Sequence, residues 1–189
     1  VVTLATSLHR RGRNVALICA SAEGPLREEA PDGIPIVDLG LSRVIGLPAR
    51  LPRALSRWPG ALIFSSMTHT NIMTLLATRV LRQHLGPVVV QEVALMSHGR
   101  EHNPRLKSAA LGFLTRRLYR RADQVLAVSE TVADETAIAA RLPRNALGVL
   151  PNPVDLQRVR AGAAAGPADH PWLSEHRRGE GTPVLLAVG

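Results

Sequence analysis

The fold of this chain is decided by two short segments, ADQVLAVSE at residues 122–130 and LGVLPNPVD at residues 147–155. Each contains an apolar run of strand length and ends in polar or turn-forming residues, at Ser129-Glu130 and at Pro151-Asn152. The residues between the two segments have the length of one helix, so the pattern predicts a strand, a helix and a second strand. Open parallel sheets bind their ligands at the carboxyl ends of the strands. We therefore expect the functional site at those strand ends.

The rest of the chain repeats this alternation of helices and strands. Apolar runs predict strands at residues 14–20, 34–39, 61–64, 88–90, 124–128, 147–150 and 183–189. Apolar residues spaced three and four apart predict helices at residues 1–10, 44–58, 72–85, 104–121 and from Glu130 onward. Alternating strands and helices predict an α/β fold with a doubly wound parallel sheet. Val88-Val89-Val90, a continuous β-branched run, is expected to be a central, buried strand.

Composition limits the class of protein. With 189 residues, of which 46% are hydrophobic, the chain can bury a full core. Its net charge of +8 favours anionic partners such as phosphates or a lipid surface. Only 3% of the residues are aromatic and no basic stretch is interleaved with aromatic residues, which argues against nucleic acid. The one cysteine, Cys19, cannot form an internal disulfide, which indicates a reducing compartment.

Targeting signals and chain ends give the expected location and domain division. The sequence shows no secretory signal and no apolar run of about 18 residues, the length that spans a bilayer, so we expect a cytoplasmic protein. Residues 1–8 read as the middle of a helix and residues 183–189 as a strand cut at its first turn residue, so we expect further chain at both ends. The Ala/Gly-rich residues 161–167 predict a flexible connector. The expected divisions are a first domain at residues 1–160, a connector at 161–182, and the first strand of a second domain at 183–189.

The common signatures of dinucleotide, P-loop and zinc sites are absent from the sequence. It contains no G-x-G-x-x-G, no G-x-x-x-x-G-K-[ST], no H-E-x-x-H and no C-x-x-C. His98 and His102 are four residues apart, but they flank a glycine in an expected loop. We therefore expect no metal site.

Polar side chains follow the expected strands in four places. These clusters are Glu23-Gly24, residues 65–71, Gln91-Glu92, and Ser129-Glu130 with Pro151-Asn152. Because the carboxyl ends of parallel strands share one edge, the clusters are expected to line a crevice whose hydroxyl, amide, imidazole and carboxylate groups suit a polyhydroxylated substrate. The alternative is helix capping, which is the favoured interpretation of Ser129 taken by itself. Taken alone, His69 is most simply a surface or capping histidine.

The expected helix at residues 104–121 is amphipathic and basic. Its expected apolar stripe consists of Leu106, Ala109, Ala110, Phe113, Leu114 and Leu118, and elsewhere on the helix stand Arg105, Lys107, Arg116, Arg117, Arg120 and Arg121. Such a helix can lie on an anionic membrane surface, which would make the protein peripheral on the inner face of a membrane. A core-facing helix with a solvated basic face explains the same pattern equally well.

The order of several short motifs resembles that of the family 4 retaining glycosyltransferases. These motifs are residues 11–15, 23–26, 37–40, 68–71, 118–123, 128–130, 151–155, 170–172 and 184–189, and they span nearly the whole chain. The resemblance implies the amino-terminal, acceptor-binding, Rossmann-like domain of a two-domain GT-B architecture. The family's glycine-rich loop would precede Val1. Its basic phosphate-binding pair and its E-x7-E signature would follow Gly189.

The resemblance also implies a reaction. A sugar would pass from a nucleoside-diphosphate sugar to a hydroxyl of a glycan or lipid-linked acceptor, with retention at the anomeric carbon, without metal or cofactor, in cell-envelope polysaccharide synthesis. The candidate acceptor-binding residues are His69, Asn71, Glu92, Ser129, Glu130 and Asn152, and the donor-proximal residue is Gly189. Groups that stabilise the leaving diphosphate would lie beyond Gly189, so we expect residues 1–189 alone to be inactive.

One position departs from the family pattern. The family's central strand often ends in Glu-His, whereas here Val93 follows Glu92. The triplet Glu101-His102-Asn103 comes after that strand, so the role of the histidine is not transferred to it. Two alternatives stay open: a nucleotide-sugar epimerase of the same two-domain architecture, and a non-catalytic module that binds sugars or anionic lipids.

Overall fold

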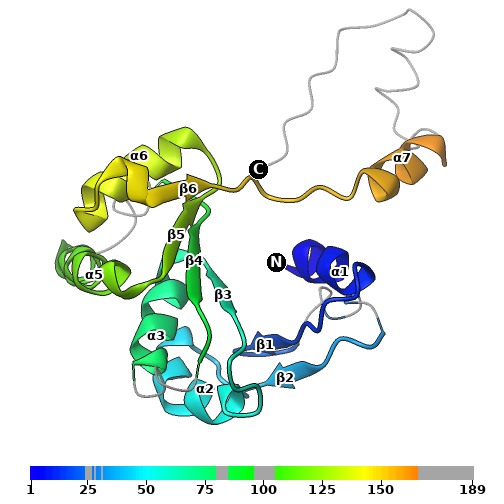
Figure 1. Cartoon of the computed structure of the whole chain (residues 1–189), viewed down its shortest axis with the longest axis horizontal. Helices are drawn as coiled ribbons and strands as arrows, with labels where there is room; N and C mark the ends of the chain where they lie inside the picture. Colours follow the sequence, from blue (N-terminus) through cyan, green and yellow to red (C-terminus); the bar gives the residue numbers. More distant parts are fainter. Residues whose placement is uncertain (24–26, 28, 31, 80–84, 96–104, 166–189) are drawn as a thin grey trace, which may run out of the picture. The chain divides into compact units, whose positions relative to one another are not determined.

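The computed structural model describes residues 1–23, 27, 29–30, 32–79, 85–95 and 105–165. Helices and strands alternate along this part of the chain (Figure 1). Every pairing between the described strands is parallel. The α/β class with parallel strands, predicted from the sequence, is therefore confirmed.

The described strands form two sheets. In the first, β1 (Leu17–Cys19) pairs with β2 (Ile36–Asp38). The second sheet consists, in spatial order, of β3 (Ile63–Ser66), β4 (Val88–Glu92), β5 (Gln124–Ala127) and β6 (Leu147–Val149). The strand predicted to be central, β4, is an inner strand of this sheet, and Val90 is fully buried. Gln91 and Glu92, expected at the outgoing end of this strand, are its last two residues.

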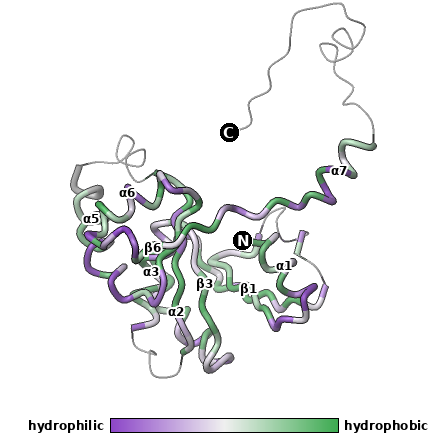
Figure 2. The backbone as a smooth tube through the Cα atoms, turned by 45° about the horizontal axis from the view of Figure 1, so that its top comes forward, coloured by the Kyte–Doolittle hydropathy of each residue, from purple (hydrophilic) through white to green (hydrophobic). Residues whose placement is uncertain are grey.

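Helices connect the strands and cover the four-stranded sheet. The helical elements are α1 (Val2–Arg10), η2 (Val44–Gly46), α2 (Leu47–Leu55), α3 (Thr68–Thr78), α5 (Arg105–Leu118), η3 (Tyr119–Arg121), α6 (Glu130–Ala140), η4 (Arg144–Ala146) and α7 (Leu156–Ala164). α3 packs on β3 and β4, α6 packs on β5 and β6, and α5 contacts both α3 and α6. These three helices therefore lie side by side on the sheet (Figure 1). Hydrophobic residues run along the strands, whereas α5 carries hydrophilic segments (Figure 2).

Three elements near the amino terminus are shorter than the sequence predicted. The strands expected at residues 14–20 and 34–39 are reduced to the three-residue pair of β1 and β2. Pro35 has no amide hydrogen to donate and only accepts a hydrogen bond, from the amide of Leu17 at 2.9 Å. The helix expected at residues 44–58 starts as the 3₁₀ turn η2 and its α-helical part ends at Leu55.

The apolar stripe predicted for the basic helix was wrong in part. Phe113 is 65% exposed, and Ala109 and Ala110 are exposed too. The buried side of α5 is formed by Thr115 and Leu118, with Leu111 and Leu114 partly buried beside them. These four positions are spaced three and four apart, as one helix face requires. Thr115 fits this face because its hydroxyl donates to the carbonyl of Leu111 at 2.9 Å.

The chain divides into two compact units, Val1–Pro153 and Val154–Gly189. In the second unit, Asp155 caps α7, because its Oδ1 accepts the amide hydrogens of Gln157 and Arg158 at 3.1 Å each. Because α7 runs to Ala164, the Ala/Gly-rich segment expected to be a flexible connector begins as a helix.

Several predictions lie outside the described residues. These are the strand expected at residues 183–189, with Gly189, the pair His98 and His102, and the first residue expected for the basic helix, Pro104. In the described ranges, no helix has both the length and the apolar character needed to cross a membrane.

Candidate functional site

The carboxyl ends of β3 to β6 form one continuous edge. Backbone hydrogen bonds continue the pairing just past the strands, from Met67 N to Gln91 O at 3.2 Å, from Val128 N to Glu92 O at 3.0 Å and from Leu150 N to Ala127 O at 2.8 Å. The side chain of Gln91 adds a link from β4 across to the end of β6, because its Nε2 donates to the carbonyl of Leu150 at 2.8 Å. This edge is the place where the sequence predicted the site, and we call it the strand-end edge.

Three predicted site residues have solvent-exposed polar side chains at the strand-end edge. His69 is the second residue of α3, Ser129 immediately precedes α6, and Asn152 follows β6; all three are exposed. Within the part of the chain that the structure describes, the side chains of His69 and Asn152 have no hydrogen-bond partner. No described residue therefore occupies either side chain.

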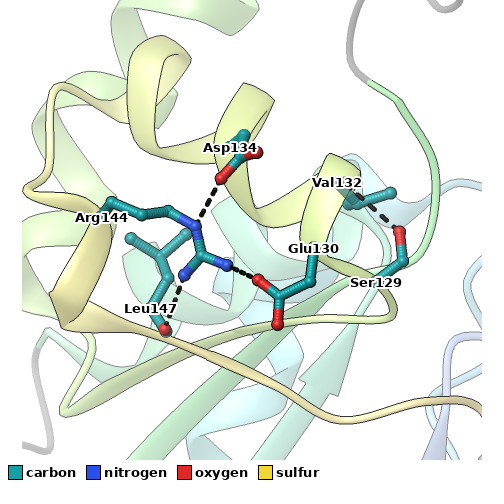
Figure 3. Close-up of polar contacts among 6 residues, drawn as sticks. All are labelled: Ser129, Glu130, Val132, Asp134, Arg144 and Leu147. Atoms are coloured by element: carbon teal, nitrogen blue, oxygen red, sulfur yellow. Dashed lines mark hydrogen bonds and ion pairs between the residues drawn. The ribbon is translucent and has the colours of Figure 1, made fainter.

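Ser129 and Glu130 have structural partners of their own (Figure 3). Ser129 Oγ accepts the amide hydrogen of Val132 at 3.3 Å, so the capping interpretation of this serine is confirmed. Glu130 forms an ion pair with Arg144, which also donates from Nε to Asp134 Oδ1 at 2.6 Å. The carboxylates are largely exposed, so each pair contributes no more than about 1 kcal/mol. Their effect is to hold the start of α6 against the segment that leads into β6.

The other two predicted residues, Asn71 and Glu92, lie beneath the strand-end edge. Their side chains are 0% and 1% exposed, and the adjoining Tyr119 is 1% exposed. Glu92 accepts hydrogen bonds from Thr68 Oγ1 at 2.7 Å, from Asn71 Nδ2 at 3.2 Å and from the hydroxyl of Tyr119. Asn71 Nδ2 is also 2.9 Å from the carbonyl of Gln91. We call Thr68, Asn71, Glu92 and Tyr119 the Glu92 network.

The Glu92 network is a buried carboxyl group surrounded by neutral donors. No ion pair links Glu92 to a Lys or Arg among the described residues. Burial raises the pKa of Glu92, and the hydrogen bonds from Tyr119, Thr68 and Asn71 and the nearby charge of His69 oppose that rise. Burial and the adjacent Glu92 raise the pKa of Tyr119 well above its ordinary value. Both groups are thereby biased toward their neutral forms.

The structure thus separates the predicted site residues into two groups. His69, Ser129, Glu130 and Asn152 are exposed, whereas Asn71 and Glu92 are enclosed. Direct contact of these two with an acceptor stays a prediction that requires the network to open. Of the predicted cluster Glu23-Gly24, Glu23 is exposed in the segment that follows β1 of the two-stranded sheet, and Gly24 lies outside the described residues.

Sequence reasoning did not single out Thr68 and Tyr119, although both bind Glu92. Thr68 belongs to the cluster at residues 65–71, in which only His69 and Asn71 were predicted as site residues. Tyr119 is the only tyrosine of the chain and precedes two arginines, a context that resembles a surface segment. No group of three or more metal-ligating side chains occurs among the described residues.

Parallel strands whose polar ends share one edge define a Rossmann-like ligand-binding domain. The chain matches the sequence model described as Glycosyltransferase Family 4 over residues 1–158. It therefore belongs to this family, in agreement with the resemblance seen in the sequence. The match includes every described strand and all of His69, Asn71, Glu92, Ser129, Glu130 and Asn152. No curated protein matches the chain.

Proposed function

We propose that this chain is the acceptor-binding part of a retaining glycosyltransferase that uses a nucleoside-diphosphate sugar. The acceptor is a hydroxyl group of a glycan or of a lipid-linked sugar. The observation that carries the proposal is the strand-end edge of a family 4 domain, where the exposed side chains of His69 and Asn152 have no hydrogen-bond partner among the described residues. An imidazole and an amide supply both donors and acceptors, which suits the hydroxyl groups of a sugar.

In this proposal the acceptor-binding part and the donor-binding part of the enzyme have different roles. His69, Ser129 and Asn152 orient the acceptor hydroxyl, which is a contribution to positioning. The departing diphosphate is stabilised by positive charge and helix N-termini in a donor-binding part that we expect beyond Gly189, and Gly189 is the proposed donor-proximal residue. The transfer uses neither a metal ion nor a cofactor.

The first prediction concerns activity. Residues 1–189 alone are expected to transfer sugar at least about a thousandfold more slowly than a chain extended by the donor-binding part, because the proposal assigns the groups that stabilise the diphosphate to that part. The measurement is release of nucleoside diphosphate from a panel of nucleotide sugars, with and without glycan and lipid-linked acceptors. The anomeric configuration of the product, read by NMR, tests retention. Equal rates from the short and the extended chain would overturn this division of roles.

The same assay separates the alternatives kept from the sequence. A nucleotide-sugar epimerase would change the sugar of the donor without an acceptor and without forming a glycoside. A non-catalytic module would bind but convert nothing, even in the extended chain. Transfer that depends on the acceptor is expected only for a glycosyltransferase.

We further propose that α5 holds the enzyme at an anionic membrane, where a lipid-linked acceptor resides. Phe113 is 65% exposed, and Arg116 and Arg117 are exposed one turn further along the same helix face. Neither arginine has a partner among the described residues, and α5 contains no acidic residue. An aromatic side chain flanked by unpaired cations is the pattern of a helix that lies at a lipid surface.

The second prediction tests this surface with phosphatidylglycerol-containing vesicles. Replacing both Arg116 and Arg117 by glutamine should weaken binding roughly thirtyfold, because each cation near an anionic surface contributes about 1 kcal/mol. The matched control is Arg10→Gln with Arg11→Gln, which removes the same charge from exposed positions at the end of α1. Salt should weaken the wild-type interaction. An equal loss in both double variants would mean that overall charge, and not α5, binds the vesicle.

A further inference from the structure

The turn that joins β3 to α3 has a strained backbone. Met67, between Ser66 at the end of β3 and Thr68 at the start of α3, has a φ angle of +80°. This region favours glycine, and a side chain there costs about 1–3 kcal/mol. Such a conformation persists only where neighbouring groups hold it in place.

The last two residues of β4 hold this turn. Gln91 O accepts the amide hydrogen of Met67 at 3.2 Å, and Glu92 Oε2 accepts the hydroxyl hydrogen of Thr68 at 2.7 Å. The first turn of α3 closes on Met67 itself, because the backbone amide of Asn71 donates to Met67 O at 2.8 Å. The link from Thr68 to Glu92 is the side-chain bond that fixes the first residue of the helix.

Glu92 is itself held from another direction. Tyr119, in η3, donates its hydroxyl hydrogen to Glu92 Oε1, and Asn71 Nδ2 donates to the same oxygen. The carboxyl group is therefore fixed between η3 and α3, and at 1% exposure it does not reach a molecule on the strand-end edge. His69, the residue next to Thr68, is exposed at that edge.

We propose that Glu92 is a positioning residue that acts through Thr68. Its carboxyl group fixes the turn between β3 and α3, and so determines where His69 meets the acceptor. The inference rests on the proposed function in one respect, namely that His69 contacts the acceptor. It predicts that the hydroxyl of Thr68, which donates to Glu92, controls how well the acceptor binds.

The third prediction isolates the bond between Thr68 and Glu92. Thr68→Val removes the hydroxyl while nearly keeping the shape, and Thr68→Ser restores it. In NMR spectra of the 189-residue chain, the valine variant should shift the imidazole signals of His69, identified among the seven histidines by their loss in His69→Gln. Amide exchange at the start of α3 should become roughly five- to tenfold faster, as expected for one lost hydrogen bond. Thr68→Ser, which keeps the hydroxyl donor to Glu92, should remain close to the wild type.

A kinetic test with the extended, active chain adds a readout that a purely structural role would not change. Thr68→Val should lower kcat/KM for the acceptor roughly tenfold, mainly through KM. In a His69→Gln background the same change should have little further effect, because residues that act through one another are not additive. Independent, multiplying effects of the two substitutions would overturn the inference.

The two tests keep this inference separate from the proposed function. If the extended chain transfers no sugar from any donor, the proposed glycosyltransferase activity fails, and the NMR comparison still decides the role of Glu92. Unchanged His69 signals and exchange rates in Thr68→Val would overturn that role. So would changes spread evenly over all helices, because they would indicate general destabilisation and not a local loss of position.

Discussion

Replacing Asn71 by aspartate is expected to lower the free energy of unfolding by about 3–5 kcal/mol at neutral pH, the range typical of an uncompensated buried charge. The substitution keeps the size of a side chain that is 0% exposed, but it removes the Nδ2 donor. That donor supplies hydrogen bonds to Gln91 O and Glu92 Oε1. The variant would instead place a second carboxyl group 3.2 Å from the first, where one proton must be shared or two like charges must be buried.

The pH dependence of this loss has a definite sign. Burial already raises the pKa of Glu92 above its ordinary value of 4.5, so folding shifts this group toward its neutral form. A group of this kind contributes stability below its unfolded pKa and loses that contribution as the pH rises through the folded pKa. The carboxyl group introduced by Asn71→Asp adds a pH-dependent contribution to stability of the same sign. The Asn71→Asp variant should therefore approach wild-type stability in acid and fall furthest behind it at neutral pH.

Urea unfolding of variant and wild type, compared at acidic and at neutral pH, measures this difference. The matched control is Asn152→Asp, the same chemical change at an exposed position, which should alter stability by less than about 0.5 kcal/mol at either pH. An Asn71→Asp variant as stable as the wild type at neutral pH would contradict the enclosed Glu92 network.

The strand-end edge could be predicted from the sequence for a simple physical reason. Strands β3 to β6 are apolar runs that stop at polar residues, and parallel strands leave their carboxyl ends on one side. The cap made by Ser129 could be predicted too, because it depends only on residues three apart along the chain. Such features are local or follow from the parallel order of the strands.

The enclosure of Asn71 and Glu92 could not be read from the polarity of their side chains. The spacing of residues does indicate the buried face of α3. Asn71, Thr74, Leu75 and Thr78 are all buried and are spaced three and four apart on this helix. Polar residues occupy three of these four positions, so hydrophobicity alone concealed the buried face. Glu92 depends on a partner 27 positions later, the hydroxyl of Tyr119, and one sequence gives no signal for such a pairing.

Removing Tyr119 is the second large effect we expect. Tyr119→Ala should destabilise the protein by about 3–5 kcal/mol, as usual for truncating a buried aromatic side chain. Tyr119→Phe keeps the ring and isolates the hydroxyl. It should still lower the free energy of unfolding by about 1–3 kcal/mol, because Glu92 Oε1 loses a donor in a site closed to water. Denaturant unfolding of the two variants separates packing from hydrogen bonding, and a phenylalanine variant equal to the wild type would mean that the hydroxyl contributes nothing.

The ionisation of Tyr119 provides an independent check on the same contact. The chain has one tyrosine, so the ultraviolet absorption of tyrosinate reports this residue alone. Burial and the nearby Glu92 raise its pKa well above 10.0, so it should stay neutral in the folded protein through the range where a free tyrosine ionises. The sign of the linkage follows: stability is lost as the pH rises above the unfolded pKa, and tyrosinate should appear together with unfolding. Ionisation near the ordinary pKa while the helices remain folded would show that the hydroxyl is open to water and does not hold Glu92.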